Sequence, residues 1–200
     1  MTFYPAPLPV PAALRTAEFL LQPLQPIYVE LDFAAITSSR DMLRRWSNTP
    51  WVQDDFTLAE NYRDLARHDS EHQRRESFTY TVLKPLATEC LGCVYITPAT
   101  HPLRHLSCEA EFSGAALPTS QVATVSFWVR QSLLQEDCDR RLFSTLQTWF
   151  TQDWHFTQVL FLTSQQDTRQ ISLFMQASLV PCDELDAPGF SHRFVRFASN

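Results

Sequence analysis

The sequence predicts a single α/β (α+β) domain, and three observations support this fold class. Two strand-like runs, 77–84 and 89–97, are separated by a short turn that begins at Pro85, as in a β-hairpin. The run 122–130 is apolar on both faces, which is typical of a central strand. Helical and strand patterns then alternate up to residue 198, so we expect helices packed on a sheet.

Proline dominates the beginning of the chain. Residues 1–26 hold six prolines, which fix the backbone and remove hydrogen-bond donors. We therefore expect an extended proline-rich arm, tied down by Leu20 and Leu21, ahead of a domain at 27–200.

Capping residues mark two of the expected helices. Thr57 and Glu60 match the T-x-x-E capping box, and Asp167 with Gln170 predicts a second cap. In chain order, the elements expected around the hairpin and the central strand are a strand at 27–33, a helix at 35–46, a helix from Thr57, an irregular segment at 98–121, a helix at 137–154, a strand at 157–163, a helix from Asp167 and a strand at 192–198.

The overall charge and composition argue against several classes of protein. The net charge of −6 argues against a nucleic-acid binder, which needs a basic surface for phosphates. No apolar run is long enough to span a membrane, and no signal peptide is visible. Five cysteines at irregular spacing fit reduced thiols, so we expect a cytoplasmic protein. A homodimer is compatible with the aromatic strands and the arm.

Several short motifs connect the second half of the chain to a known family. They are VSFWVR at 125–130, LQTWF at 146–150, Leu91-Gly92 in a strand, and the segment from Phe161 to Leu179. Together these motifs resemble the GNAT superfamily of N-acetyltransferases, in the branch of the ribosomal-protein N-terminal acetyltransferases. The resemblance covers roughly residues 77–197. It implies a GNAT-like mixed, mostly antiparallel central sheet flanked by helices.

The resemblance also implies an activity. A GNAT enzyme moves an acetyl group from acetyl-CoA, its co-substrate, to a primary amine of a small molecule or a peptide. Backbone amides at the end of the central strand polarise the thioester, and the loop that follows holds the CoA diphosphate. On this basis the residues expected to bind acetyl-CoA are Trp128, Val129, Arg130, Gln135, Asp137 and Arg140.

The diphosphate loop departs from the family pattern. Its counterpart, 133–139, has no glycine and carries three carboxylates, which repel phosphate. Two outcomes stay open. Either main-chain amides still bind CoA with help from Arg140 or Arg141, or the chain is a catalytically inactive GNAT-fold binding or scaffold protein. A third hypothesis is a general α+β ligand-binding domain whose pocket is the segment 46–56.

Candidate catalytic and acceptor-binding residues come from two acidic segments. Glu109 and Glu111, just before the central strand, are candidate general bases. The second acidic segment combines aromatic residues with carboxylates, which suits the binding of a cationic amine. Asp54 and Asp55 are equally compatible with an exposed acidic turn before Thr57. The expected acceptor-binding residues are Trp46, Trp51, Asp54, Asp55 and Phe56.

The cysteines indicate no metal site. Cys90-x-x-Cys93 with His101 and His105 has four potential zinc ligands, but the strand pattern predicts the two cysteines on opposite faces. We therefore expect no bound metal. Cys138 lies near a helix N-terminus, where it is either a reactive thiol or a core contact.

Overall fold

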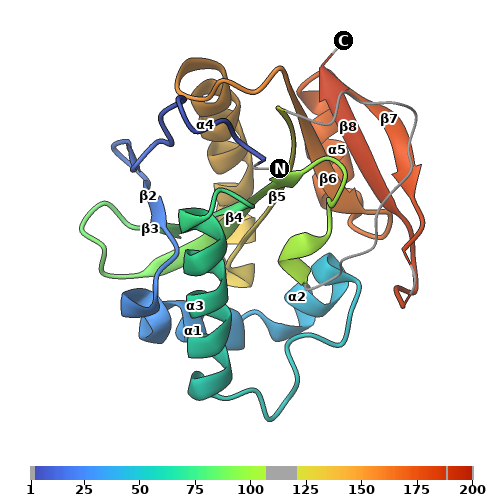
Figure 1. Ribbon diagram of the computed structural model, residues 1–200. Helices are drawn as coiled ribbons and strands as arrows, with labels where there is room; N and C mark the ends of the chain where they lie inside the picture. The colour runs from blue at the N-terminus through green and yellow to red at the C-terminus, as the bar shows by residue number, and fades with distance from the viewer. Residues whose placement is uncertain (1–2, 107–120, 188, 200) are drawn as a thin grey trace.

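The computed structural model describes residues 3–106, 121–187 and 189–199, in which an eight-stranded sheet carries helices on both faces (Figure 1). The strand order is β1-β2-β3-β4-β5-β6-β8-β7. The strands are β1 (Leu14–Arg15), β2 (Leu20–Pro23), β3 (Phe78–Leu83), β4 (Cys90–Pro98), β5 (Val122–Val129), β6 (Gln158–Ser164), β7 (Leu179–Leu185) and β8 (Phe194–Ser199). The helices are α1 (Val29–Thr37), α2 (Arg40–Ser47), α3 (Leu58–Gln73), α4 (Cys138–Gln152) and α5 (Thr168–Gln176).

One pair of strands differs from the rest of the sheet. β5 and β6 are parallel, and every other neighbouring pair is antiparallel. The helix α4 makes the crossover between them, as a parallel pair requires. The prediction of a mixed, mostly antiparallel sheet flanked by helices is confirmed.

The two faces of the sheet have separate apolar cores. On one face α1, α2 and α3 pack with residues such as Ile36, Trp46 and Leu65. On the other face α4 and α5 pack with residues such as Trp149 and Phe174. Each helix buries one apolar stripe, as expected for amphipathic helices on a sheet.

The proline-rich arm folds onto this second face. Phe3 and Tyr4 are buried in the core beside α4, and Tyr80 Oη donates to Pro11 O at 2.6 Å. Leu20 and Leu21 are buried in β2, which confirms that they tie the arm down.

The expected strand at 27–33 is wrong, because this segment forms a 3₁₀ turn at Pro26–Tyr28 and then α1. Its polar Asp32 lies on the buried side of the helix with Ala35 and Ile36, at helical rather than strand spacing. The expected helix at 35–46 is two helices, α1 and α2. The strand β7 was not expected, because Pro181 interrupts its strand pattern, and its pairing with β8 shifts in register between Pro181 and Asp183.

The predicted capping motifs are confirmed. Glu60 N–H donates to Thr57 Oγ1 at 3.2 Å, and Thr57 N–H donates to Glu60 Oε2 at 2.8 Å. Gln170 N–H donates to Asp167 Oδ1 at 3.0 Å. These contacts fix where α3 and α5 begin, and both helices contribute residues to the candidate site.

Gly92 marks an irregularity in β4, as its position within a strand pattern suggests. A Cβ at Gly92 would lie 2.0 Å from Trp128 O, so only glycine permits this approach of β4 to β5. The register of β3 and β4 shifts beside it. Because of this shift Cys90 and Cys93 lie in the same apolar cluster, so the expectation of opposite faces is wrong.

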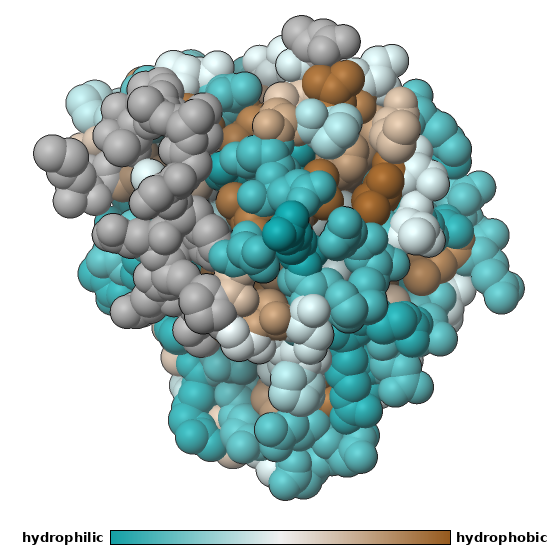
Figure 2. All heavy atoms as spheres, turned by 90° about the vertical axis from the view of Figure 1, so that its right-hand side faces the viewer, coloured by the Kyte–Doolittle hydropathy of each residue, from teal (hydrophilic) through white to brown (hydrophobic). Residues whose placement is uncertain are grey.

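The side of the molecule formed by the β7 edge is largely hydrophilic, with apolar residues gathered near the top of the view in Figure 2. Pro181, Asp183 and Glu184 lie in this edge strand, where proline and charge discourage pairing with other chains. Among the described residues, no helix has the length and apolar character needed to cross a membrane.

Candidate active site

The parallel strands β5 and β6 separate before either of them ends. Their pairing runs from Val122↔Gln158 to Val125↔Phe161. Beyond that point β5 stays paired with β4 as far as Val129, whereas β6 continues alongside β8. In the described part of the chain, the last half of β5 therefore has no neighbouring strand on its β6 side.

Backbone alternation decides which groups of β5 face this gap. Arg130 N–H donates to Leu91 O in β4 at 2.7 Å. On the opposite side, Phe127 O accepts from Gln170 Nε2 at 2.7 Å. Successive residues of a strand direct their backbone groups to opposite edges. Val129 therefore presents its N–H and C=O to the gap, and Trp128 presents its own toward β4.

A cavity of about 240 Å³ lies at this gap, and we call it the splay cavity. Residues from α2, the end of β5, the start of α4 and the start of α5 line it, among them Arg45, Trp46, Trp128, Val129, Arg169 and Gln170. Gln170 is 6% exposed, and its Oε1 has no hydrogen-bond partner among the described residues.

The segment between β5 and α4 is compact and uses its own backbone donors. It forms a 3₁₀ turn at Gln131–Glu136, and Asp137 follows with a left-handed φ of 53°. Gln131 N–H donates to Ser39 Oγ at 3.1 Å. Leu133 N–H and Asp137 N–H donate to carbonyls within the segment, at 3.0 and 3.3 Å. These three amides are therefore not free to bind an anion.

Arg169 connects the start of α5 to this segment. Its guanidinium contacts both oxygens of the buried Asp139, at 2.6 and 2.8 Å, Leu134 O at 2.7 Å and Asp137 Oδ1 at 3.1 Å. The hydrogen bond that Arg169 donates to Asp139 is the main cause that raises the pKa of Arg169, which stays charged. Two of the three carboxylates that the sequence places in this segment, Asp137 and Asp139, are thus paired within the protein.

Three other residues expected to bind acetyl-CoA do not line the splay cavity. Arg130 Nε donates to Cys90 O at 2.6 Å, which holds its guanidinium against β4. Gln135 is exposed. Arg140 donates to Gln176 Oε1 at 2.8 Å, so it ties α4 to α5.

Two further hollows adjoin one another on the face covered by α1 and α3. The inner hollow has a volume of about 110 Å³, and its lining includes Asp32, His68, Tyr95 and His105. The outer hollow has a volume of about 470 Å³ and is more open. Thr49, Trp51, Asp64 and Leu106 line both hollows, so the outer hollow is the entrance to the inner one.

Asp32 is the buried carboxylate of the inner hollow. Asn61 Nδ2 donates to Asp32 Oδ2 at 2.9 Å. Burial raises the pKa of Asp32 to about 6, although the bond from Asn61 and the charge of Arg130 act in the opposite direction. A carboxyl with this pKa exchanges its proton near neutral pH, which suits a general base.

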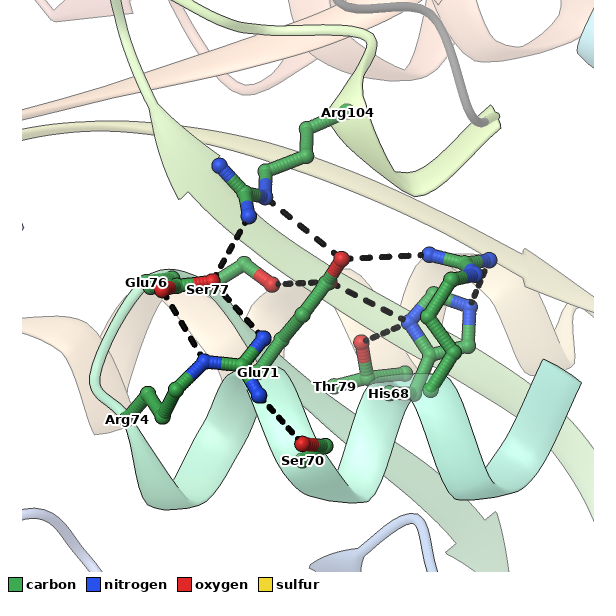
Figure 3. A network of polar contacts seen from close by, with 9 residues as sticks. His68, Ser70, Glu71, Arg74, Glu76, Ser77, Thr79 and Arg104 are labelled. Carbon is green, nitrogen blue, oxygen red and sulfur yellow. Dashed lines mark hydrogen bonds and ion pairs between the residues drawn. The ribbon is translucent and has the colours of Figure 1, made fainter.

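Arg67 and His68 of α3 line the inner hollow, and His68 belongs to the network of polar side chains in Figure 3. Arg67 Nη2 contacts His68 Nε2 at 3.1 Å, and because arginine only donates, Nε2 is the acceptor. Thr79 Oγ1 lies 3.1 Å from His68 Nδ1. Burial lowers the pKa of His68 well below its ordinary value, so this histidine is neutral.

Glu71 is the centre of that network. Ser77 Oγ donates to Glu71 Oε2 at 2.7 Å, and Arg67 and Arg104 approach Glu71 Oε1 at 3.4 and 3.5 Å. The buried carboxylate is therefore compensated by two cations and a hydroxyl, as a buried charge requires. Glu71 serves to position His68 and Arg67, and it does not line the hollow.

An aromatic group separates the inner hollow from the splay cavity. Tyr95 stacks on His105 with ring centroids 4.7 Å apart, and Trp46 packs on both rings. Trp128 Nε1 donates to Tyr95 Oη at 3.2 Å. Since Trp46 and Trp128 line the splay cavity, one layer of side chains lies between the two sites.

The predicted acceptor-binding residues are distributed around these hollows. Trp51, Asp55 and Phe56 line the outer hollow, whereas Trp46 belongs to the aromatic layer. Asp54 lines neither hollow: it is exposed and pairs with Arg44 at 2.6 Å. Glu109 and Glu111 lie outside the described residues.

Cys90, Cys93 and Cys138 are buried core residues, whereas Cys182 is exposed. Burial raises the pKa of Cys90 to about 12 and that of Cys138 to about 11, so neither thiol is activated, and Cys138 is a core contact. The described residues contain no group of histidine, cysteine and carboxylate side chains that could hold a metal ion.

A parallel strand pair that separates over a cavity, in a mixed sheet with this strand order, defines the GNAT N-acetyltransferase fold, and this chain has that fold. No protein-family model matches the sequence, and no curated protein matches it either.

Solved structures with this fold match almost the whole chain. One is a ribosomal-protein-S5-alanine acetyltransferase from Vibrio fischeri, with 10% identity, coverage of 94% of this chain and 96% of that one, and a TM-score of 0.69. Another is the microcin C7 self-immunity acetyltransferase MccE in complex with acetyl-CoA and AMP, with 10% identity, coverage of 95% and 97%, and a TM-score of 0.71. A third is RimL, a ribosomal L7/L12 α-N-protein acetyltransferase, in complex with coenzyme A, with 12% identity, coverage of 94% and 96%, and a TM-score of 0.68.

Three residues of the site were not expected from the sequence in these roles. Asp32 was assigned to a strand, and its partner Asn61 is far away in the chain. The sequence around Arg169 does not indicate its role, because its partners Asp137 and Asp139 lie about 30 positions earlier, where α4 begins. The helical spacing of Asp32, Ala35 and Ile36 after Pro26 was the one local signal available.

Proposed function

We propose that this chain is an N-acetyltransferase that moves an acetyl group from acetyl-CoA to a primary amine of a small molecule or a peptide. The observation that carries the proposal is the splay cavity, where the open edge of β5 meets Gln170. Proteins with the same fold include acetyltransferases in complex with coenzyme A or acetyl-CoA, which supports the same donor here.

In this proposal, Val129 is the residue that contacts the thioester of acetyl-CoA. Its N–H faces the gap between β5 and β6, where it can donate to the oxygen of a thioester carbonyl. A fixed backbone donor stabilises negative charge that develops on that oxygen during transfer. This role depends on the register of β5 and not on the identity of a side chain.

The acceptor side is the pair of adjoining hollows. An amine enters by the outer hollow, past Trp51, Asp55 and Phe56, and loses its proton to Asp32 in the inner hollow. The aromatic layer of Trp46, Tyr95 and Trp128 has to open so that the amine nitrogen reaches the acetyl carbon in the splay cavity. The nitrogen then forms a bond to that carbon as the carbon–sulfur bond breaks. The thiolate leaves and takes the second proton of the amine nitrogen, which leaves the neutral amide, and Asp32 returns the first proton to solvent.

One observation favours a second function, a GNAT-fold binding or scaffold protein. In the segment 131–139, where the fold places a diphosphate, two of the three carboxylates, Asp137 and Asp139, are already paired with Arg169. A protein that no longer binds CoA could keep these ion pairs, because its segment would not need a free cation for the diphosphate.

Acetyl-CoA-dependent thiol release in the presence of a panel of amines, including peptides with free N-termini, separates the two functions. Amine-dependent thiol release with an acetylated product, identified by mass, supports the transferase. A folded protein that releases no thiol and binds no acetyl-CoA at millimolar concentration supports the binding protein. Glu109→Gln and Glu111→Gln, measured beside Asp32→Asn, decide among the three candidate bases.

A further inference from the structure

The inner hollow offers hydrogen-bond acceptors that the protein itself does not use. Asn61 donates to one oxygen of the buried Asp32, and among the described residues no donor contacts the other oxygen. His105 lines the same hollow and is 8% exposed, and its Nδ1 is buried without a hydrogen-bond partner in the described part of the chain. Burial keeps this imidazole neutral against the smaller influence of the Pro102 carbonyl, so one ring nitrogen is an acceptor. This end of the site therefore suits a group with several N–H donors, such as the reacting amine.

Asp64 lies where the two hollows meet, and it lines both of them. It is half-buried, and it makes no hydrogen bond or ion pair with the other described residues. Burial is the main cause that raises its pKa, whereas Arg67 and Arg63 act on it only at longer range. Arg67 is already bound to His68 and Glu71. A half-buried carboxylate without a partner favours a ligand that brings a positive charge.

The outer hollow has a surplus of negative charge. Besides the carboxylate at its neck, its described lining includes Asp55 and Glu60, against one cation, Arg63. Hydrogen bonds from Thr57 lower the pKa of Glu60, so this carboxylate stays charged. The rings of Trp51 and Phe56 lie in the same lining, and aromatic faces attract cations. A hollow lined mainly by one sign of charge concentrates ligands of the opposite sign.

One reacting amine does not neutralise the whole site. When the new bond forms, Asp32 has taken a proton from the amine, so both groups are uncharged. Asp64 and the surplus charge of the outer hollow then have no partner among the described residues. A second ammonium group on the same acceptor supplies that partner.

We propose that the acceptor is a dicationic amine, whose primary amine reacts in the inner hollow and whose second ammonium group is held by Asp64 and Asp55. The inference rests on the proposed acetyl transfer and names the substrate class of its acceptor site. The two charged groups are joined by a slim chain, because the inner hollow has a volume of only about 110 Å³. A linear diamine and a peptide that begins with lysine both have this chemistry.

Acetylation of matched amines by the full chain tests this inference. Cadaverine and pentylamine have the same chain length and differ in the second ammonium group, as do peptides that begin with lysine and with norleucine. We expect kcat/KM for the dicationic member of at least one pair to exceed that of its partner by about tenfold or more. This ratio falls at high salt, because salt screens the charges. The pair with the larger ratio identifies the acceptor as a small molecule or a peptide.

The possible failures of this test are distinguishable. A ratio near one in both pairs overturns the inference and leaves acetyl transfer standing. If the folded protein acetylates none of the amines, the proposed transfer is wrong, and calorimetric titration then decides the inference by itself. Tighter binding of cadaverine than of pentylamine supports a dicationic ligand in the hollows, and equal binding or no binding overturns it.

Substitutions of the two carboxylates locate the second ammonium group. Asp64→Asn keeps the shape of the side chain and removes its charge, and no partner in the described protein is lost, so we expect the variant to fold. The ratio of kcat/KM for the dicationic amine to that for the monoamine falls by about three- to tenfold, and Asp64→Glu restores it. Asp55→Asn lowers the ratio by about two- to threefold, because Asp55 is more exposed to solvent.

The matched control is Asp41→Asn, at an exposed carboxylate of α2 that lines neither hollow. It removes the same charge, and we expect it to leave the ratio within about a factor of two. The ratio is also an internal control, because any loss of folded protein affects both amines equally. A ratio that is unchanged in both Asp64→Asn and Asp55→Asn overturns the assignment of the second ammonium group to these carboxylates.

Discussion

The splay cavity and the inner hollow are adjacent, yet they are built from different parts of the chain. The splay cavity depends on backbone: the separation of β5 from β6 and the open edge at Val129. The inner hollow depends on side chains, with Asp32 held by Asn61 and walls formed by His68, Tyr95 and others. The backbone geometry is shared with other proteins of the fold at 10–12% identity, whereas the side chains of the inner hollow have to be identified from the structure of this chain.

This difference predicts where substitutions have their largest effects. In a site built from backbone, the substitution of one side chain changes selectivity or affinity and leaves the chemistry in place. In a site built from side chains, the loss of one group removes a chemical step. The following predictions test this contrast, from the largest expected effect to the smallest.

Asp32→Asn has the largest expected effect. It keeps the hydrogen-bonding shape and removes the proton acceptor, so we expect kcat/KM for the amine to fall by about two orders of magnitude or more. The wild-type pH profile has an acid limb with a midpoint near pH 6, because burial raises the pKa of Asp32 to about 6, and the variant lacks this limb. The matched control is Glu30→Gln, at an exposed carboxylate of the same helix. A variant that retains both its rate and the acid limb shows that Asp32 is not the base.

Acid destabilises the folded protein through two buried histidines, His105 in the inner hollow and His72 beside Phe78. Burial lowers the pKa of His105 to about 3 and that of His72 to about 4, whereas in the unfolded chain both titrate near the ordinary value of 6.5. Below pH 6.5 the unfolded chain binds more protons than the folded protein, so stability is lost as the pH falls. The raised pKa of Asp32 acts with the opposite sign below pH 6.

His105→Phe isolates one of these contributions and keeps a ring against Tyr95. We expect the free energy of unfolding to fall less steeply between pH 6 and pH 4 in the variant, by up to about 1.4 kcal/mol per pH unit. Urea unfolding at several pH values measures this slope. The exposed His155→Gln is the control, and an unchanged slope in His105→Phe argues that His105 is not buried and neutral as the structure shows.

Asp139→Asn tests the segment after β5, and its expected effect is smaller. Removal of the charge leaves Arg169 with weaker partners, so its guanidinium becomes free to approach a diphosphate. We expect CoA to bind about three- to tenfold more tightly relative to pantetheine, and the free energy of unfolding to fall by about 1–3 kcal/mol. Calorimetry and urea unfolding measure the two effects. An affinity ratio equal to that of the wild type shows that Arg169 is too far away to serve as an anchor.

The contrast between backbone and side chains also explains what the sequence could predict. The hairpin, the central strand and the caps at Thr57 and Asp167 follow from local patterns, and all are confirmed. Because the open edge of β5 is a property of the fold, the resemblance at 125–130 was sufficient to place Val129 there.

The inner hollow could not be predicted in the same way. Asp32 is a base candidate because of its burial and its bond to Asn61, 29 positions later, which no local pattern contains. The same holds for Arg169, whose partner Asp139 is 30 positions earlier. The strand expected at 27–33 also prevented the identification of Asp32. In a strand Asp32 would share a face with residues two positions away, and not with Ala35 and Ile36.

The outer hollow gives the smallest expected effect, because it contacts the amine in both the ground state and the transition state. Phe56→Ala removes an aromatic wall that stacks on Phe33 with ring centroids 6.1 Å apart. We expect KM for the amine to rise by about three- to tenfold with kcat unchanged, since uniform binding is lost. Tyr62→Ala, at an exposed aromatic residue on α3 that lines neither hollow, is the control. A fall in kcat instead of a rise in KM would show that Phe56 acts on the reacting groups, and the outer hollow would then belong to the catalytic site.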